Sequence, residues 1–172
     1  ALSYARMSPP NRTGAILMLP LKGVRVIEVA QNLAGPYCGE ILAHLGADVI
    51  KVERPGGGDD TRGWGPPFLD GAGSSFHAVN LGKRSVALDL KDAAARARLL
   101  ELVAGADVLV QNLRPGSMEA LGLDAGPLLA QFPRLVYCSM WAMGSAGPLR
   151  DHPGFDPMVQ AFSGMMMMSG AP

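Results

Sequence analysis

The chain has 172 residues, 48% of them hydrophobic, and its 15 Lys and Arg balance 15 Asp and Glu. Its 22 Gly and 14 Pro stay below the content of low-complexity chains, so we expect a packed core and exclude disorder as the main state. A net charge of zero without any block of like charges excludes the basic surface that nucleic acids and anionic membranes require, and indicates a small-molecule partner.

Neither a disulfide framework nor a metal site is indicated. Cys38 and Cys138 lie far apart without a Cys-x-x-Cys pair, and the three histidines share no metal-ligand spacing. We therefore expect two buried thiols in a cytoplasmic protein that binds no metal. No apolar run reaches the roughly 18–20 residues of a membrane span. Residues 1–20, which several prolines interrupt, are expected to form a flexible extension.

Short β-branched segments alternate with longer Ala- and Leu-rich segments from Val24 onward. This alternation is typical of strand–helix–strand units on a parallel sheet. The sequence therefore predicts an α/β fold with a Rossmann-like parallel sheet flanked by helices. The expected strands are 24–30, 48–53, 85–90, 107–112 and 135–141.

Two helices are expected between these strands. In the first, which follows Gly35-Pro36, Tyr37, Ile41 and Leu45 recur at helical spacing, and Gly46 supplies the stop. The second runs from about Asp92, whose charge suits the N-terminal end of the helix dipole, to about residue 104.

An internal repeat places an Arg-Pro-Gly turn after two of the strands. Gly-Ala-Asp-Val precedes each turn, at 46–49 and at 105–108, and the turns lie at 54–56 and 114–116. Ligands of open parallel sheets bind beyond the carboxyl ends of the strands. Arg54 and Arg114 are therefore expected to converge on one anionic ligand, unless they are two solvated turn arginines.

The segment 55–84 is a long loop rich in Gly, Pro and Asp. Loops of this length inside a compact domain are usually functional or disordered. Trp64 and Phe68 favour a loop that closes on a ligand, and the alternative is a mobile surface loop with one anchoring aromatic residue.

The first strand, turn and helix have the order of a dinucleotide-binding unit, but the turn does not fit. Residues 34–39 read Ala-Gly-Pro-Tyr-Cys-Gly, whereas the fingerprint requires G-x-G-x-x-G so that the backbone can approach a pyrophosphate. Pro36 also removes an amide donor. A nicotinamide dehydrogenase is therefore the weaker alternative.

Two features lie beyond the fifth strand. Asp156 is expected near the ligand edge of the sheet or, alternatively, at the N-cap of a helix with Pro157 at the first position. Met165–Met168 are expected to fill a helix core, with the lining of an adaptable pocket as the alternative.

Seven stretches, in order and at matching spacing, resemble the family III CoA-transferases, which include formyl-CoA transferase, carnitine CoA-transferase and the related alpha-methylacyl-CoA racemases. The stretches are LKGVRVIEVA (21–30), AGP (34–36), LGADVIKVERPGGGD (45–59), TRGW (61–64), NLGKRSVALDLK (80–91), ADVLVQNLRPG (106–116) and GFDPMVQAFSG (154–164).

The resemblance implies that an acyl-CoA binds to a Rossmann-like large domain and that CoA is transferred between carboxylic acids. Residues 21–172 would form the N-terminal part of that domain, with its remainder and a smaller domain outside this chain. By position, the resemblance assigns Arg54 to the adenine, Lys91 to the phosphates, Gln31, Leu33 and Ala34 to the turn facing the thioester, Leu88, Asn112 and Leu113 to the pocket lining, and Trp64 to the acyl pocket.

Three positions depart from the pattern of the family. Leu33 stands where some members have Gln, and Ala120 where some have Arg, so Arg114 is expected to supply the missing phosphate contact. Phe155, which we count among the CoA-binding residues, stands where the racemases carry the His of a His/Asp acid–base pair. This departure favours CoA transfer over racemization and leaves Asp156 an assisting role.

The nucleophile of the family transferases is an Asp that attacks the thioester to give an acyl–enzyme anhydride. By the resemblance we expect it about ten to twenty residues past Pro172. The family also implies an interlocked homodimer, or pairing with a second chain that carries the missing part. Two functions follow: a CoA-transferase acting on an acyl-CoA and a carboxylic acid, with this chain supplying the CoA-binding part, or a CoA-binding fragment without activity. A racemase-like enzyme is a further alternative.

Overall fold

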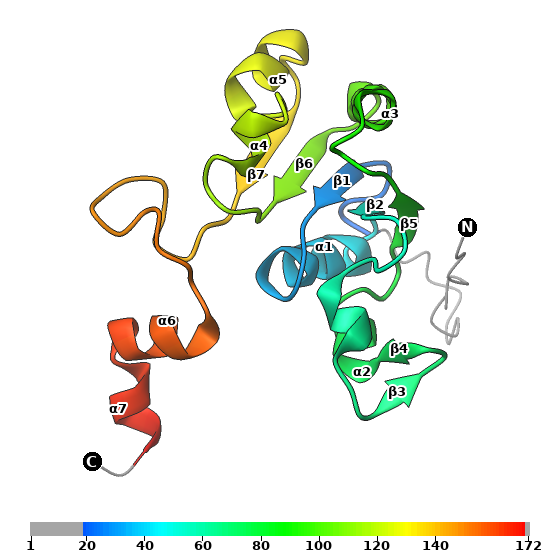
Figure 1. Ribbon diagram of the computed structural model, residues 1–172. Helices are drawn as coiled ribbons and strands as arrows, with labels where there is room; N and C mark the ends of the chain where they lie inside the picture. Colours follow the sequence, from blue (N-terminus) through cyan, green and yellow to red (C-terminus); the bar gives the residue numbers. More distant parts are fainter. Residues whose placement is uncertain (1–18, 171–172) are drawn as a thin grey trace.

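Five parallel strands form the central sheet of the computed structural model, which describes residues 19–170, in the order β5-β2-β1-β6-β7 (Figure 1). The expected extension therefore lies outside the described residues, except for positions 19 and 20. All five expected strands are present, as β1 (Arg25–Val29), β2 (Asp48–Glu53), β5 (Arg84–Ala87), β6 (Val108–Gln111) and β7 (Val136–Ser139).

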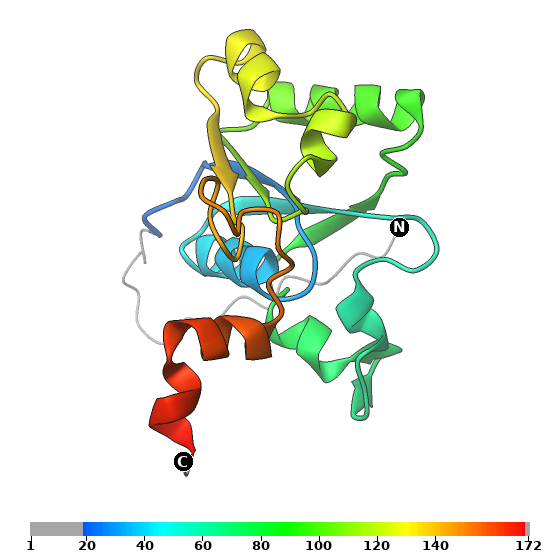
Figure 2. The ribbon, with the colours of Figure 1, turned by 60° about the vertical axis from the view of Figure 1, so that its left-hand side comes forward.

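Helices cover both faces of the sheet, as Figure 2 shows, with α1 (Ala34–His44) on one face and three helices on the other. The three are α3 (Ala93–Ala104), α4 (Ser117–Ala120) and α5 (Ala125–Gln131). Both expected helices are confirmed. Asp92 caps α3 by accepting a hydrogen bond from the Ala95 amide at 2.9 Å, and Gly46 follows α1 at a φ of 103°.

The strand order reverses at β1. The chain runs outward through β2 and β5, then crosses back to β6 and β7 on the other side of β1. Val26 of β1 is in register with Val49 of β2 and with Val108 of β6. In an open α/β sheet, the crevice beyond the strand ends at such a reversal is the usual ligand site.

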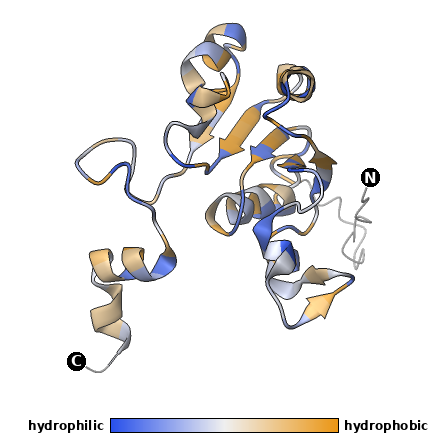
Figure 3. Ribbon diagram, viewed as in Figure 1, coloured by the Kyte–Doolittle hydropathy of each residue, from blue (hydrophilic) through white to orange (hydrophobic). Residues whose placement is uncertain are grey.

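Alternate strand residues supply the core on each face, and Figure 3 shows the hydrophobic colours concentrated on the strands. Ile27, Ile50 and Leu109 face α3 and its neighbours, packed with Leu99 and Val103. The α1 face has a smaller apolar cluster around Val26, Val49 and Val110.

Helix α1 buries a different face from the one its apolar spacing predicts. Tyr37 and Ile41 are 56% and 44% exposed, whereas Gly35, Gly39 and Glu40 are buried against the sheet. The reason is that β1 and β2 carry charged side chains on the face that α1 covers. The helix packs there through Gly35 and Gly39, because glycines leave room for side chains between the helix and the sheet.

The segment 55–84 is more ordered than the expected long loop. It contains the 3-10 helix η1 (Asp60–Gly63), a hairpin of β3 (Phe68–Leu69) and β4 (Ala72–Gly73), and helix α2 (Ser74–Ala78). The segment therefore has regular structure where a long loop was expected, and it packs beside α1 (Figure 1).

Helices α6 (Asp156–Ser163) and α7 (Met165–Ser169) stand apart from the sheet in both ribbon views (Figures 1 and 2). Met167 and Met168 are 81% and 88% exposed, so the expectation that the methionine run fills a core is wrong for this chain. No helix of residues 19–170 is long and apolar enough to cross a membrane.

Candidate functional site

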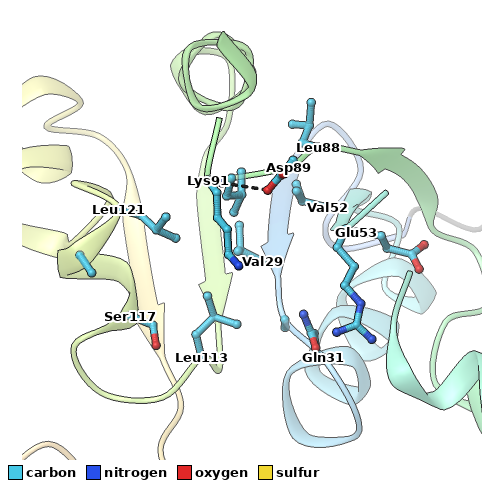
Figure 4. Close-up of a pocket in the computed structure, with 14 residues that line it drawn as sticks. Val29, Gln31, Val52, Glu53, Leu88, Asp89, Lys91, Leu113, Ser117 and Leu121 are labelled. Carbon is cyan, nitrogen blue, oxygen red and sulfur yellow. Dashed lines mark hydrogen bonds between the residues drawn. The ribbon is translucent and has the colours of Figure 1, made fainter. Parts of the chain in front are cut away.

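A cavity of about 390 Å³ opens beyond the carboxyl ends of β1, β2, β5 and β6, at the reversal of strand order (Figure 4). It lies at the expected ligand edge of the sheet. Its lining is Val29, Ala30, Gln31, Val52, Glu53, Arg54, Leu88, Asp89, Leu90, Lys91, Leu113, Ser117, Ala120 and Leu121.

The walls of the cavity are mostly apolar, and one cation stands at its β5 side. Figure 4 shows the Lys91 side chain extending from the loop after β5 into the cavity beside Val29. The loop is fixed because the Lys91 amide donates to Asp89 Oδ1 at 3.0 Å and Arg96 donates to the Lys91 carbonyl at 2.9 Å. Leu88 and Leu90 line the cavity because β5 ends at Ala87, earlier than the sequence predicts.

A second cation, Arg54, lines the cavity from the end of β2. Its guanidinium donates a hydrogen bond to Asp60 at the start of η1, and both side chains are about half exposed. The Arg54 side chain runs beside Gly57, where a Cβ would lie 3.4 Å from Arg54 Nε. A planar cation and a separate ammonium group thus approach one apolar cavity from two strand ends.

Glu53 occupies the place where dinucleotide-binding folds hold the ribose with an acidic residue. In this chain both carboxylate oxygens are already bonded, by Arg62 at 2.7 Å, by Ser85 Oγ at 2.6 Å and by the Asp59 amide at 2.9 Å. Burial alone would raise the pKa of Glu53, but these hydrogen bonds lower it to about 2. A carboxylate so engaged does not serve a ribose, which adds to the case against a nicotinamide dehydrogenase.

The turn between β1 and α1 borders the cavity and is held from β6. Asn112 donates to the Gln31 carbonyl and accepts from the Gln31 amide, both at 2.8 Å. Gly35 allows the close approach, because a Cβ there would lie 3.0 Å from Asn112 Cγ and clash with Ala30 Cβ. Leu33 and Ala34 follow as exposed residues at the start of α1.

A buried ionic cluster lies behind this turn, on the α1 face of the sheet. Lys51 Nζ is 2.9 Å from Glu28 Oε1, 2.8 Å from Asp59 Oδ2 and 2.8 Å from the Ala30 carbonyl. Lys83 Nζ is 2.8 Å from Glu28 Oε2 and donates to the Pro36 carbonyl and to Asn80. Desolvation lowers the pKa of Lys83 to about 8, although Glu28 raises it. Each ammonium group therefore has three acceptors.

The cavity brings together five of the residues assigned from the sequence, namely Gln31, Arg54, Leu88, Lys91 and Leu113. Leu33, Ala34 and Asn112 belong to the adjoining turn or support it.

Arg114 lines a separate, smaller cavity with Tyr137 and Trp141. Arg54 and Arg114 therefore line different cavities, and their convergence on one ligand stays a prediction. Burial, together with the nearby Glu119 and Asp124, raises the pKa of Tyr137 to about 12. These two acidic side chains also line the small cavity and oppose the binding of a phosphate there.

The remaining assigned residues lie away from the main cavity. Trp64 is 52% exposed next to η1, and Phe155 is 63% exposed before α6. Asp156 is the first residue of α6 and not its N-cap, and its carboxylate accepts from Gln160 Nε2 at 2.5 Å. Both cysteines are half-buried, which is less than expected.

Sequence reasoning missed the buried ionic cluster entirely. Glu28, Lys51, Asp59 and Lys83 are each at most 4% exposed. Lys51 and Glu28 interrupt two otherwise apolar strands, and this interruption is the sequence feature that could have indicated a buried ion pair. Within residues 19–170 no group of His, Cys, Asp and Glu side chains is arranged to hold a metal ion.

Comparison with known proteins identifies the family. A family profile described as CoA-transferase family III matches residues 21–172. The chain belongs to CoA-transferase family III. A succinate–glutarate CoA-transferase of Agrobacterium fabrum is 47% identical over 159 residues, which cover 89% of this chain and 40% of that protein. An acetyl-CoA:oxalate CoA-transferase of Acetobacter aceti is 46% identical over 153 residues, which cover 89% of this chain and 39% of that protein.

Solved structures of similar proteins share the fold. A CAIB/BAIF family protein from Brucella suis superposes with a TM-score of 0.85 at 46% identity, covering 89% of this chain and 41% of that one. A hypothetical protein from Mycobacterium tuberculosis gives a TM-score of 0.80 at 42% identity, covering 89% of this chain and 42% of that one. The chain thus spans about two fifths of the length of these relatives.

Proposed function

We propose that this chain supplies the CoA-binding part of a CoA-transferase that exchanges CoA between an acyl-CoA and a carboxylic acid. The observation that carries the proposal is the apolar cavity at the reversal of strand order, with Lys91 and Arg54 at its edges, in a member of CoA-transferase family III. CoA combines phosphates, which suit ammonium and guanidinium groups, with a flat adenine and a thin pantetheine arm.

In this proposal Lys91 pairs with the phosphates, and the Arg54 guanidinium, braced by Asp60, flanks the adenine. Leu88 and Leu113 contact the apolar parts of CoA. The Gln31–Ala34 turn faces the thioester, and the Trp64 segment shapes the acyl site. Phe155 and Asp156 join the site through the segment that carries α6, with Asp156 assisting and not attacking.

The chemical step that we propose is attack of an aspartate carboxylate on the thioester carbonyl. The carboxylate oxygen forms a bond to the acyl carbon, the C–S bond breaks, and CoA leaves as a thiolate while the acyl group remains on the enzyme as a mixed anhydride. The thiolate then attacks the aspartyl carbonyl of the anhydride, which releases the donor acid as a carboxylate and leaves CoA on the enzyme as a thioester. The acceptor carboxylate attacks this thioester and expels the thiolate, which attacks the acceptor's acyl carbon in the new anhydride, so that a new acyl-CoA forms and the aspartate is freed. We place the nucleophile outside residues 1–172, either further along the same polypeptide or in a second one.

We further propose that the acids exchanged are small dicarboxylic acids. Support comes from the names of the relatives, which specify succinate, glutarate, oxalate and malate. Two relatives from Chloroflexus aurantiacus are named as the alpha and beta subunits of one transferase. Assembly with a second polypeptide, as a homodimer or with a different chain, and a cytoplasmic location complete the proposal.

Binding of CoA is measured by isothermal titration calorimetry on the 172-residue chain. Lys91→Ala is expected to weaken CoA binding about 10- to 100-fold, because a charge-assisted contact to phosphate is lost. Lys22→Ala removes an equal charge from an exposed position away from the cavity and serves as the control. Equal affinities for the two variants would contradict the assignment of the cavity.

Turnover separates a transferase from a CoA-binding fragment without activity. The chain is incubated with succinyl-CoA and hydroxylamine, alone and with the polypeptide that carries the proposed nucleophile. Hydroxylamine also reacts slowly with succinyl-CoA itself, so each rate is compared with a protein-free control. Hydroxamate formation above this control only in the presence of the nucleophile supports the proposed division of roles. CoA binding with no formation above the control under either condition favours the inactive fragment.

A further inference from the structure

We propose that Asp59 is a positioning residue, which holds the turn between β1 and α1 in the geometry that acyl transfer requires. This inference rests on the proposed function, because that function places the turn at the thioester. Asp59 does not line the cavity and was not among the residues assigned from the sequence.

The turn is held at three consecutive residues by three different parts of the chain. Lys51 of β2 binds the Ala30 carbonyl at 2.8 Å, and Asn112 after β6 binds both backbone groups of Gln31. Asp59 Oδ1 then accepts from the Asn32 amide at 3.2 Å. The last restraint before α1 is therefore a side chain from the loop after β2.

Asn32 needs such a restraint because its φ is 66°, in the left-handed region that residues other than glycine occupy infrequently. The direction of the chain into Leu33 and Ala34 depends on this one residue. Loss of the bond from its amide frees Asn32 to move toward ordinary φ values, and α1 would then begin with its first residues displaced.

Asp59 is well suited to this restraint because its carboxylate is itself immobile. Asp59 is 1% exposed, Oδ2 lies 2.8 Å from Lys51 Nζ, and Oδ1 also accepts from the amide and the hydroxyl of Thr61 at 3.0 and 2.8 Å. Burial raises the pKa of Asp59, but Lys51 and Thr61 outweigh this effect and lower it, so the acceptor stays ionised. Lys51 thus links the restraint on Ala30 to the restraint on Asn32.

Leu88 and Lys91, which we assign to CoA, do not contact Asp59, whereas Arg54 is braced by Asp60 next to it. Leu88 and Lys91 follow β5, and their loop is fixed by Asp89 and Arg96. A change at Asp59 should therefore separate two quantities. The rate of acyl transfer should fall about 10- to 100-fold, as expected for a displacement near the reacting atoms, and the affinity for CoA should fall clearly less than this, because Lys91 keeps its place.

The test uses Asp59→Asn, which keeps the shape, removes the charge and places an NH2 donor group opposite either Lys51 Nζ or the amide of Asn32, so that one of these contacts must break. Asp70→Asn is the matched change at an exposed hairpin position. Amide hydrogen exchange of the free 172-residue chain is measured by NMR. Exchange at Gln31 and Asn32 should quicken about tenfold in Asp59→Asn and stay unchanged in Asp70→Asn. Calorimetry then gives the CoA affinity, and kcat is measured with succinyl-CoA in the presence of the nucleophile-bearing polypeptide.

Unchanged exchange at Asn32 would overturn the proposal, and so would a loss of CoA affinity as large as the loss of kcat. Should Asp59→Asn fail to fold, Thr61→Val removes one hydrogen bond to Asp59 and is expected to give a smaller change in the same direction. Failure of the unaltered chain to bind CoA would refute the proposed function, whereas the exchange at Asn32 would still decide whether Asp59 restrains the turn.

Discussion

Gly39→Ala tests whether α1 docks through the buried ionic cluster. Gly39 lies on the buried face of α1. A Cβ at this position would clash with Glu28 Oε2 and lie 3.0 Å from Glu28 Cδ and 3.3 Å from Lys83 Nζ. Glu28 has no room to yield, because its two oxygens lie 2.9 Å from Lys51 Nζ and 2.8 Å from Lys83 Nζ.

Two opposing effects set the size of the change. Alanine is favoured over glycine inside a helix by about 1 kcal/mol. Displacing Glu28 from a buried ion pair costs about 3–5 kcal/mol. The steric effect wins, and we expect a net loss of about 2–4 kcal/mol, which for a chain of this size lowers Tm by about 4–16 °C.

The assay is urea unfolding followed by circular dichroism, with Gly126→Ala as the control. Gly126 lies in α5, where a Cβ would make an ordinary contact of 3.7 Å with Asp124 Oδ2. Gly126→Ala should therefore raise stability by up to about 1 kcal/mol. If Gly39→Ala is as stable as Gly126→Ala, then Glu28 does not lie against Gly39 and the reasoning is refuted.

Three further outcomes are expected. The folded pKa of Glu53, about 2, lies below its ordinary value of 4.5, so the unfolded chain takes up the proton first. About 3 kcal/mol of stability present above pH 4.5 is therefore lost as the pH falls toward 2. Urea titrations between about pH 6 and pH 2 measure this loss, and Glu53→Gln should remove much of it. Arg114→Ala should leave the CoA affinity within about twofold, because Arg114 is exposed and lines the smaller cavity; a tenfold loss in calorimetry would contradict this. Burial, with Cys138 and Glu28 adding to it, raises the pKa of the Cys38 thiol, so mass spectrometry should show that iodoacetamide labels Cys38 near pH 8 more slowly than an unfolded thiol.

The sheet and its flanking helices were predictable because they depend on patterns that a single sequence displays. Runs of β-branched residues located every strand of the sheet, and Asp92 and Gly46 marked the helix ends. The buried face of α1 was not predictable in this way. The apolar spacing indicated that the face with Tyr37 and Ile41 is buried. The sheet beneath α1 carries buried charges, so the helix packs against it through its glycine face instead. The sequence did not predict η1, β3 and β4, because elements of two to four residues are too short to show a helix or strand periodicity.

The candidate site was predictable where strand ends determine it and not where side chains reach across the fold. The alternation of strands and helices predicted the ligand edge of the sheet, and the family resemblance assigned Gln31, Leu88 and Lys91, which line the cavity there because each follows a strand that ends at this edge. The equivalence of the two Arg-Pro-Gly turns suggested a shared ligand, but the structure assigns Arg54 and Arg114 to different cavities. The hydrogen bond from Lys83 to the Pro36 carbonyl could not be predicted either, because the two residues lie 47 positions apart in the sequence.

The ionic cluster makes the segment between β2 and β5 part of a single cooperative unit with the sheet. Asp59 near its start and Lys83 at its end are both buried among partners from β1, β2 and α1. Neither charge can be buried without its partner, so both ends of the segment must assemble together with the sheet. The hairpin tip at Asp70 and Gly71 lies between these two anchors and is exposed. A cut or an insertion at this tip would leave each half of the segment with its own anchor, so the tip is where the segment should best tolerate cleavage or added residues.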